Sequence, residues 1–109
     1  MSEVLEQLEA TLAERRSADP EQSYVAGLHQ KGLNKILEKV GEEAIEVVLA
    51  AKDCSPTSGR EDLVGEVSDL WFHCMVMLSH LDIELSEVTD CLAARFGTSG
   101  LEEKASRGQ

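Results

Sequence analysis

Apolar residues recur every three or four positions along most of this sequence, and the breaks between the apolar segments are rich in Pro, Gly, Ser and Asp. No stretch alternates apolar and polar residues with the period of two that is typical of a half-buried strand. Both prolines, Pro20 and Pro56, lie in the breaks, where proline ends a helix. The pattern therefore predicts an all-α protein.

Capping and breaking residues place the boundaries of the expected helices. Ser2 is suited to cap the first helix, and the segment CSPTSG breaks the chain between two long helices. The predicted helices cover residues 2–17, 23–30, 33–53, 60–81 and 85–96, and Gly97 closes the last of them. The short break around Pro56 favours antiparallel packing of the two long helices. Residues 97–109 are predicted to form a mobile tail.

The length of 109 residues fits one domain, expected to span residues 1–109. A chain of this size gains stability when more apolar surface is buried, so a homodimer is expected. The predicted fold is thus a helical bundle of about five helices that dimerisation completes.

Charge narrows the range of partners. With 21 acidic and 10 basic residues the formal net charge is −11, which argues against nucleic acid and anionic membrane as partners. The apolar run from Leu70 to Leu78 is too short to span a bilayer, and the N-terminus shows no signal peptide, so a cytoplasmic location is expected. The three cysteines include no CxxC pair and are expected to be reduced.

The first long helix carries charge beside an apolar stripe. At about 100° per residue, the stripe that is expected to face the core consists of Leu37, Val40, Ala44, Val47, Val48 and Ala51. On one flank of this stripe lie Lys35, Lys39, Glu42, Glu43 and Glu46. Three carboxylates are therefore expected on one side of this helix.

The second long helix carries a more unusual pattern of polar residues. Its polar residues form one narrow line, made of Asp62, Glu66, Asp69, His73 and His80. The remaining surface is mostly apolar, so this helix is expected to be buried nearly all round. An ionised carboxylate in such a setting costs several kcal/mol or more unless it is paired or bound to a metal.

Antiparallel packing would bring the two acidic rows face to face across a groove. Carboxylates that crowd together in a partly dehydrated groove repel each other, so they must take up protons or a cation. Oxygen ligands without cysteine favour Mg²⁺, with Mn²⁺ as the alternative, and Mg²⁺ is typically shared with substrate phosphates. The expected ligand is a polyphosphate, whose charge Lys35 and Lys39 could partly offset.

A purely structural interpretation remains open at each position. A pair of glutamates on one helix turn is most often a solvated face. The two histidines of the second long helix, His73 and His80, are more often packing residues than ligands, and His29 is expected on the surface. The tail residues Lys104 and Arg107 would by default be solvated ends of a frayed turn.

Two motifs resemble those of a known superfamily: EEAIE at residues 42–46 and, about twenty residues later, EVSD at residues 66–69. They are similar to the EExxE and ExxD motifs of the all-α, MazG-like nucleoside triphosphate pyrophosphohydrolases. A longer stretch, residues 23–81 together with RFGTSGLEEKASR, resembles the phosphoribosyl-ATP pyrophosphatase family. Where many members have Leu-Tyr-His, this chain has Trp-Phe-His at residues 71–73.

The resemblance implies Mg²⁺-dependent hydrolysis of N1-(5-phosphoribosyl)-ATP to N1-(5-phosphoribosyl)-AMP and pyrophosphate, the second step of histidine biosynthesis. The implied metal ligands are Glu43, Glu46, Glu66 and Asp69, with Glu42 as a further ligand or the base that orients water. The candidate phosphate contacts are Lys35, Lys39, His73, Arg95, Lys104 and Arg107. Related enzymes build their bundles from two or more subunits, which again implies a homodimer.

Other functions remain open from the sequence. A house-cleaning pyrophosphatase of the same superfamily would share every acidic residue named above. The histidine-pathway substrate is favoured only by the tail and by the segment that contains Ser23, Tyr24, Gly27 and Lys31. A non-catalytic helical dimerisation module would leave the acidic residues as mere surface. A di-iron carboxylate bundle is disfavoured because its Glu-x-x-His signature does not occur.

Overall fold

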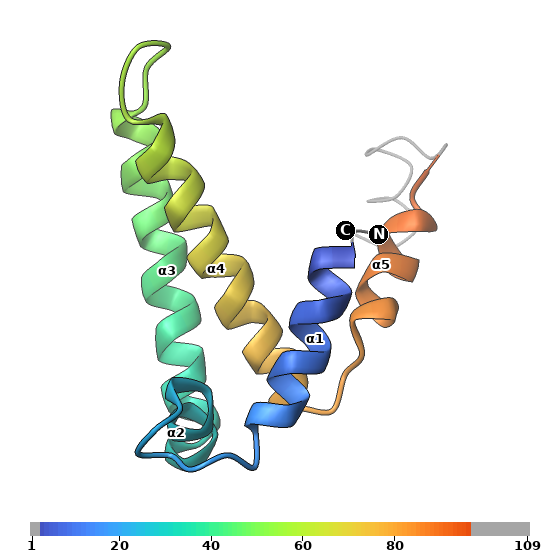
Figure 1. The fold of residues 1–109 in the computed structure, drawn as a ribbon. Helices are drawn as coiled ribbons and strands as arrows, with labels where there is room; N and C mark the ends of the chain where they lie inside the picture. Colours follow the sequence, from blue (N-terminus) through green and yellow to red (C-terminus); the bar gives the residue numbers. More distant parts are fainter. Residues whose placement is uncertain (1–2, 97–109) are drawn as a thin grey trace.

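The computed structural model describes residues 3–96 and contains five helices in this part of the chain. They are α1 (Glu3–Arg15), α2 (Tyr24–Lys31), α3 (Leu33–Asp53), α4 (Arg60–His80) and α5 (Leu85–Ala93). Figure 1 shows that α3 and α4 form a long antiparallel hairpin, with α2 at its lower end and α5 well apart from α3. The predicted all-α class, the number of helices and the antiparallel pair are confirmed.

The turn between the two long helices depends on local hydrogen bonds and on a glycine. The backbone N–H of Ser55 donates to the carbonyl oxygen of Ser58 at 2.8 Å, which closes the turn around Pro56. Gly59 follows with φ of +86°, a left-handed conformation that costs a residue with a Cβ atom extra energy. A Cβ atom there would also lie 3.2 Å from the carbonyl oxygen of Asp53. The chain can therefore reverse direction sharply and start α4 beside the end of α3.

A side-chain cap and a second glycine position α2. The Oγ atom of Ser23 accepts a hydrogen bond from the backbone N–H of Ala26 at 3.2 Å, as an N-cap residue does. Tyr24 is consequently held in the first turn of α2. Gly32 has φ of +99° and separates α2 from α3, so the two helices run in different directions without a longer loop.

The core lies where α1, α2, the first turn of α3 and the last turns of α4 meet. Its most deeply buried apolar side chains are Leu12, Val25, Leu28, Ile36 and Val76. Burial of an aliphatic side chain contributes about 1.5–3 kcal/mol to the free energy of unfolding, so this cluster anchors one end of the hairpin. The other end projects away from the core (Figure 1).

Three hydrogen bonds attach the C-terminal part to α1 and to the residue that follows it. The carboxylate of Glu9 accepts a hydrogen bond of 2.7 Å from the backbone N–H of Leu85, an otherwise unpaired donor at the start of α5. Arg16 donates to the carbonyl oxygen of Ser79 at 2.8 Å and to the carboxylate of Asp82 at 2.9 Å. These bonds fix the turn between α4 and α5 against the end of α1.

Two burial predictions are wrong for the single chain. Val48, which belongs to the predicted core stripe of α3, is 56% exposed, and Trp71 of the supposedly enclosed α4 is 55% exposed. The cause is that a two-helix hairpin buries only the faces that meet, and no described segment covers its outer sides. Exposed apolar side chains on these helices are Leu37, Ile45, Val48, Leu49, Val64 and Trp71.

The cysteines within residues 3–96 are free thiols, as predicted. Within residues 3–96, none of the helices combines the length and the apolar character that a membrane span requires.

Candidate functional site

Three carboxylates converge between α3 and α4. Glu43 and Glu46 project from successive turns of α3, and Glu66 faces them from α4. One oxygen atom from each of the three lies within 4.8 Å of the others, a spacing at which one cation could bind all of them. We call Glu43, Glu46 and Glu66 the acidic cluster.

The acidic cluster is partly shielded from water. Glu43 is only 8% exposed, and its Oε2 atom is buried with no hydrogen-bond partner among the described residues. The Oε2 atom of Glu66 is likewise buried and has no hydrogen-bond partner among the described residues. Buried polar atoms nearly always have a partner, so a buried, unpartnered carboxylate oxygen on each side of the hairpin fits a site that binds a cation.

Two carboxylates of the acidic cluster, Glu43 and Glu66, have a raised proton affinity. Burial, and after it the negative charge of Glu46, raises the pKa of Glu43 above its ordinary value. For Glu66 the largest cause of a raised pKa is a hydrogen bond with the Glu46 carboxyl group, followed by burial and the nearby negative charges. Such a bond requires a proton, because two ionised carboxylates have none to share. Protons thus relieve part of the repulsion that a divalent cation would remove.

A hollow of about 350 Å³ adjoins the acidic cluster on the side of the hairpin turn. Its carboxylate-bearing residues are Glu46, Asp53, Asp62 and Glu66, and in the described part of the chain no basic side chain lines it. A polyphosphate in such a hollow would be repelled unless cations entered with it. Asp53 was not among the residues expected from the sequence, because it ends a helix and belongs to neither motif.

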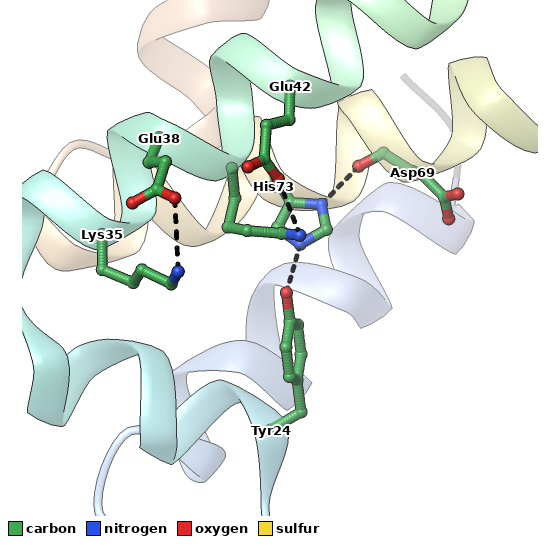
Figure 2. A network of polar contacts seen from close by, with 7 residues as sticks. Tyr24, Lys35, Glu38, Glu42, Asp69 and His73 are labelled. Carbon is green, nitrogen blue, oxygen red and sulfur yellow. Dashed lines mark hydrogen bonds and ion pairs between the residues drawn. The ribbon is translucent and has the colours of Figure 1, made fainter.

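Two acidic residues of the motifs lie outside the acidic cluster. Glu42 is exposed and pairs with Lys39, whose Nζ atom lies 3.1 Å from Glu42 Oε2. Asp69 is exposed, and its carboxylate points away from His73 in Figure 2. Its charge still acts on the acidic cluster, because it contributes to the raised pKa of both Glu43 and Glu66.

The two lysines of α3 already have carboxylate partners. Lys35 lies 3.4 Å from the carboxylate of Glu38, one turn further along the helix (Figure 2). The pKa of Lys39 is raised by its hydrogen bond to Glu42 and by the charge of that residue, with smaller contributions from Tyr24 and Glu43. Lys39 is therefore close to both Tyr24 and the acidic cluster, and of the two lysines it is the better placed to meet a phosphate.

His73 is buried and forms hydrogen bonds through both ring nitrogens. Its Nδ1 atom lies 2.8 Å from the backbone carbonyl oxygen of Asp69, and its Nε2 atom lies 2.8 Å from the Tyr24 hydroxyl (Figure 2). A carbonyl oxygen only accepts, so Nδ1 carries the hydrogen and, in the neutral ring, Nε2 accepts from Tyr24. His73 thus ties α2 to α4 beside the acidic cluster, a connection that the sequence alone did not reveal.

The remaining candidates lie elsewhere or outside the described range. Arg95 follows α5, which is remote from the hairpin turn in Figure 1, and its guanidinium lies 3.9 Å from the Sγ atom of Cys91. Lys104 and Arg107 lie outside the described residues.

The expectation that His29 is a surface residue is wrong: its half-buried ring stacks on that of His80, with 2.8 Å between the Nδ1 atoms.

Two sequence comparisons relate this chain to known proteins. Residues 5–96 match a family model described as phosphoribosyl-ATP pyrophosphohydrolase. The chain is 51% identical over 108 residues to a protein of Hydrogenovibrio crunogenus named phosphoribosyl-ATP pyrophosphatase. The alignment covers 99% of this chain and 96% of that relative.

Proposed function

The chain belongs to the phosphoribosyl-ATP pyrophosphohydrolase family, and on this basis we propose that it hydrolyses N1-(5-phosphoribosyl)-ATP to N1-(5-phosphoribosyl)-AMP and pyrophosphate. This reaction is the second step of histidine biosynthesis. The observation that carries the proposal is the acidic cluster, in which Glu43, Glu46 and Glu66 meet across the hairpin. The match over nearly the whole chain supports the choice of substrate.

A divalent cation, Mg²⁺ or alternatively Mn²⁺, is proposed to bind at the acidic cluster. The residues fit such an ion because they supply only carboxylate oxygens, because two of these oxygens are buried without partners, and because the adjoining hollow is acidic. When bound, the cation supplies positive charge that neutralises phosphate oxygens and polarises water. The proposed ligands are Glu43, Glu46 and Glu66, with Asp69 as a fourth, since its exposed side chain is free to turn.

In the proposed reaction, residues of this chain take the proton of the attacking water and counter the charge of the phosphates. Water attacks the α-phosphorus, a new P–O bond forms, and the bond from the α-phosphorus to the bridging oxygen breaks with its electron pair leaving on pyrophosphate. A carboxylate of the site takes the proton of the attacking water. Glu42 is proposed as a further ligand or as this base. Lys39, and beyond it Lys35, would counter phosphate charge on the α2 side of the acidic cluster.

The protein is further proposed to act as a homodimer. The outer sides of α3 and α4 expose large apolar residues, which an isolated hairpin leaves in water. Burial of these residues against a second copy would remove them from solvent, at about 25 cal/mol for each Å² of apolar surface. Nucleic acid is not expected as a partner, because of the net charge of −11. The cytoplasmic location stays a prediction.

The decisive test is a pyrophosphate-release assay with phosphoribosyl-ATP, with and without Mg²⁺. The wild-type protein should release pyrophosphate only with the cation, and the double variant Glu43→Gln/Asp69→Asn should lose at least about a hundredfold in rate. A matched control is Glu6→Gln/Asp90→Asn, which removes the same charges from exposed positions on α1 and α5 and should retain the wild-type rate.

Two outcomes would overturn the assignment. Hydrolysis of dCTP or dUTP as efficiently as phosphoribosyl-ATP would favour the house-cleaning pyrophosphatase of the wider superfamily. Equal behaviour of the two double variants, with no pyrophosphate release from any of these nucleotides, would favour the non-catalytic module.

A further inference from the structure

A second hollow is lined by Tyr24, whose hydroxyl is bonded to His73 beside the acidic cluster. It has a volume of about 390 Å³, which is within the range of small-molecule pockets. It opens between the end of α1, the start of α2 and the middle of α4. The side chains that line it include Arg15, Gln22, Ser23, Tyr24 and Phe72.

Two aromatic rings form one wall of the hollow. The rings of Tyr24 and Phe72 are 6.4 Å apart between centroids and inclined by only 25°, so they present nearly parallel faces. Tyr24 is 55% exposed, yet its hydroxyl is held by His73. An exposed aromatic ring that is fixed in place loses little further conformational freedom on binding, which makes it a suitable stacking surface for a nucleobase.

A cationic side chain, Arg15, also lines this hollow. Among residues 3–96 the guanidinium of Arg15 has no ion-pair or hydrogen-bond partner, although the chain carries a net charge of −11. Its neighbour Arg16, in contrast, is paired with Asp82. A planar guanidinium with free N–H groups is suited to bidentate binding of a phosphate.

Tyr24 connects the hollow to the acidic cluster. Tyr24 lines the hollow, and its hydroxyl is bonded to His73. His73 in turn lies close enough to Glu43 for a positive charge on its ring to lower the pKa of that carboxyl group. Lys39 is also near both Tyr24 and Glu43. Tyr24 therefore belongs to the hollow and also lies next to residues that interact with the acidic cluster.

The chemistry of the substrate matches this arrangement. Phosphoribosyl-ATP carries a triphosphate at one end and a ribose 5-phosphate, attached to the adenine ring, at the other. If the triphosphate lies at the acidic cluster with its cations, the second phosphate needs a separate positive group. We propose that the hollow is the subsite for the phosphoribosyl-adenine end, with the base against Tyr24 and Phe72 and the 5-phosphate on Arg15. This inference rests on the proposed function.

The test is the kinetics of Arg15→Gln with phosphoribosyl-ATP and Mg²⁺. The contact between Arg15 and the phosphate is charge-assisted and is made equally in the bound substrate and in the transition state. Its loss should therefore raise KM by about tenfold and leave kcat within about twofold. Arg60→Gln is the matched control, because Arg60 starts α4 at the far end of the hairpin (Figure 1) and should retain the wild-type KM.

A binding experiment without turnover isolates the subsite. The wild-type protein should bind N1-(5-phosphoribosyl)-AMP more tightly than AMP, measured by calorimetric titration. Arg15→Gln should lose this preference with AMP binding unchanged, whereas Tyr24→Leu should weaken binding of both nucleotides. Circular dichroism melting of each variant checks that it is folded.

The possible failures are distinguishable. If Arg15→Gln keeps both the KM and the preference for the phosphoribosyl nucleotide while the wild-type protein releases pyrophosphate, the subsite is wrong and the proposed function stands. If the wild-type protein neither releases pyrophosphate nor binds either nucleotide, both proposals are overturned.

Discussion

The hydroxyl of Tyr24 and the Nε2 atom of His73 lie 2.8 Å apart, although the two residues are separated by 49 positions in the chain. The same imidazole donates from Nδ1 to the backbone carbonyl of Asp69, within the ExxD motif. One side chain thus joins the first turn of α2 to the helix that carries half of the candidate metal site. This contact ties the position of the α2 segment to the position of the acidic residues.

The Tyr24–His73 bond is expected to contribute measurably to stability. Tyr24→Phe removes the hydroxyl and leaves a mostly buried imidazole nitrogen without a partner, which should lower the free energy of unfolding by about 1 kcal/mol. Urea denaturation followed by circular dichroism measures the loss. In a His73→Phe background the same change should cost much less, because its partner is already absent. An equal cost in both backgrounds would show that the bond does not form.

Divalent cations should stabilise the folded protein through the acidic cluster. A ligand that binds only the native state at 100 times its Kd adds about 2.7 kcal/mol, so saturating Mg²⁺ should raise Tm by several degrees. Glu43→Gln should lose most of this rise, whereas Glu6→Gln on α1 should keep it. The measurement is a thermal melt with Mg²⁺ and with a chelator. A variant that retained the full rise would place the cation elsewhere.

The metal-free protein should become less stable as pH rises through the weakly acidic range. The pKa values of Glu43 and Glu66 are raised above the ordinary 4.5, chiefly by burial for Glu43 and by a hydrogen bond with Glu46 for Glu66. Above pH 4.5 the folded protein therefore retains protons that the unfolded chain has lost, and stability falls until the raised folded pKa values are passed. Thermal melts in chelator at a series of pH values should show this fall. Glu43→Gln should flatten it.

The stacked His29–His80 pair should make the protein sensitive to acid. Burial, then the nearby His80 and Arg16, lowers the pKa of His29 below its ordinary 6.5. Below pH 6.5 the unfolded chain binds a proton at this position that the folded protein does not, so stability falls with pH until the lowered folded pKa is passed. Urea denaturation at pH 7.5 and at lower pH measures the loss. His29→Gln should reduce the difference; an unchanged difference would assign it to other groups.

The exposed apolar residues of α3 and α4 should control the oligomeric state. Val48→Lys places a charge among these residues and should convert a dimer into a monomer, because an unpaired charge is costly to bury in an interface. Sedimentation velocity over a range of concentrations measures the change. Val4→Lys, at an exposed apolar position on α1, is the control and should remain dimeric. A wild-type protein that sediments as a monomer at all concentrations contradicts the homodimer.

Local pattern placed the two long helices closely, whereas the predictions that the first helix reaches residue 17 and the fifth residue 96 are wrong, since α1 ends at Arg15 and α5 at Ala93. The long helix predicted over residues 33–53 begins and ends at those residues, and the second differs from its prediction by one residue at its C-terminus. Both are bounded by residues whose backbone preferences are local, such as Gly32 and Gly59 with their positive φ angles. The same periodicity assigned the acidic residues of the two motifs to facing helices. The family resemblance, which is also a property of the sequence, supplied the reaction.

Only the tertiary structure decided which of these residues meet. Glu42 and Glu43 are adjacent in the chain, yet one pairs with Lys39 in solvent and the other is buried in the acidic cluster, because about 100° of helix rotation separates them. The rotation of α3 against α4 is set by packing over the whole hairpin, which no local pattern contains. The contact of Tyr24 with His73, the hollow that contains Arg15, and the exposure of Val48 and Trp71 likewise depend on how distant segments pack together.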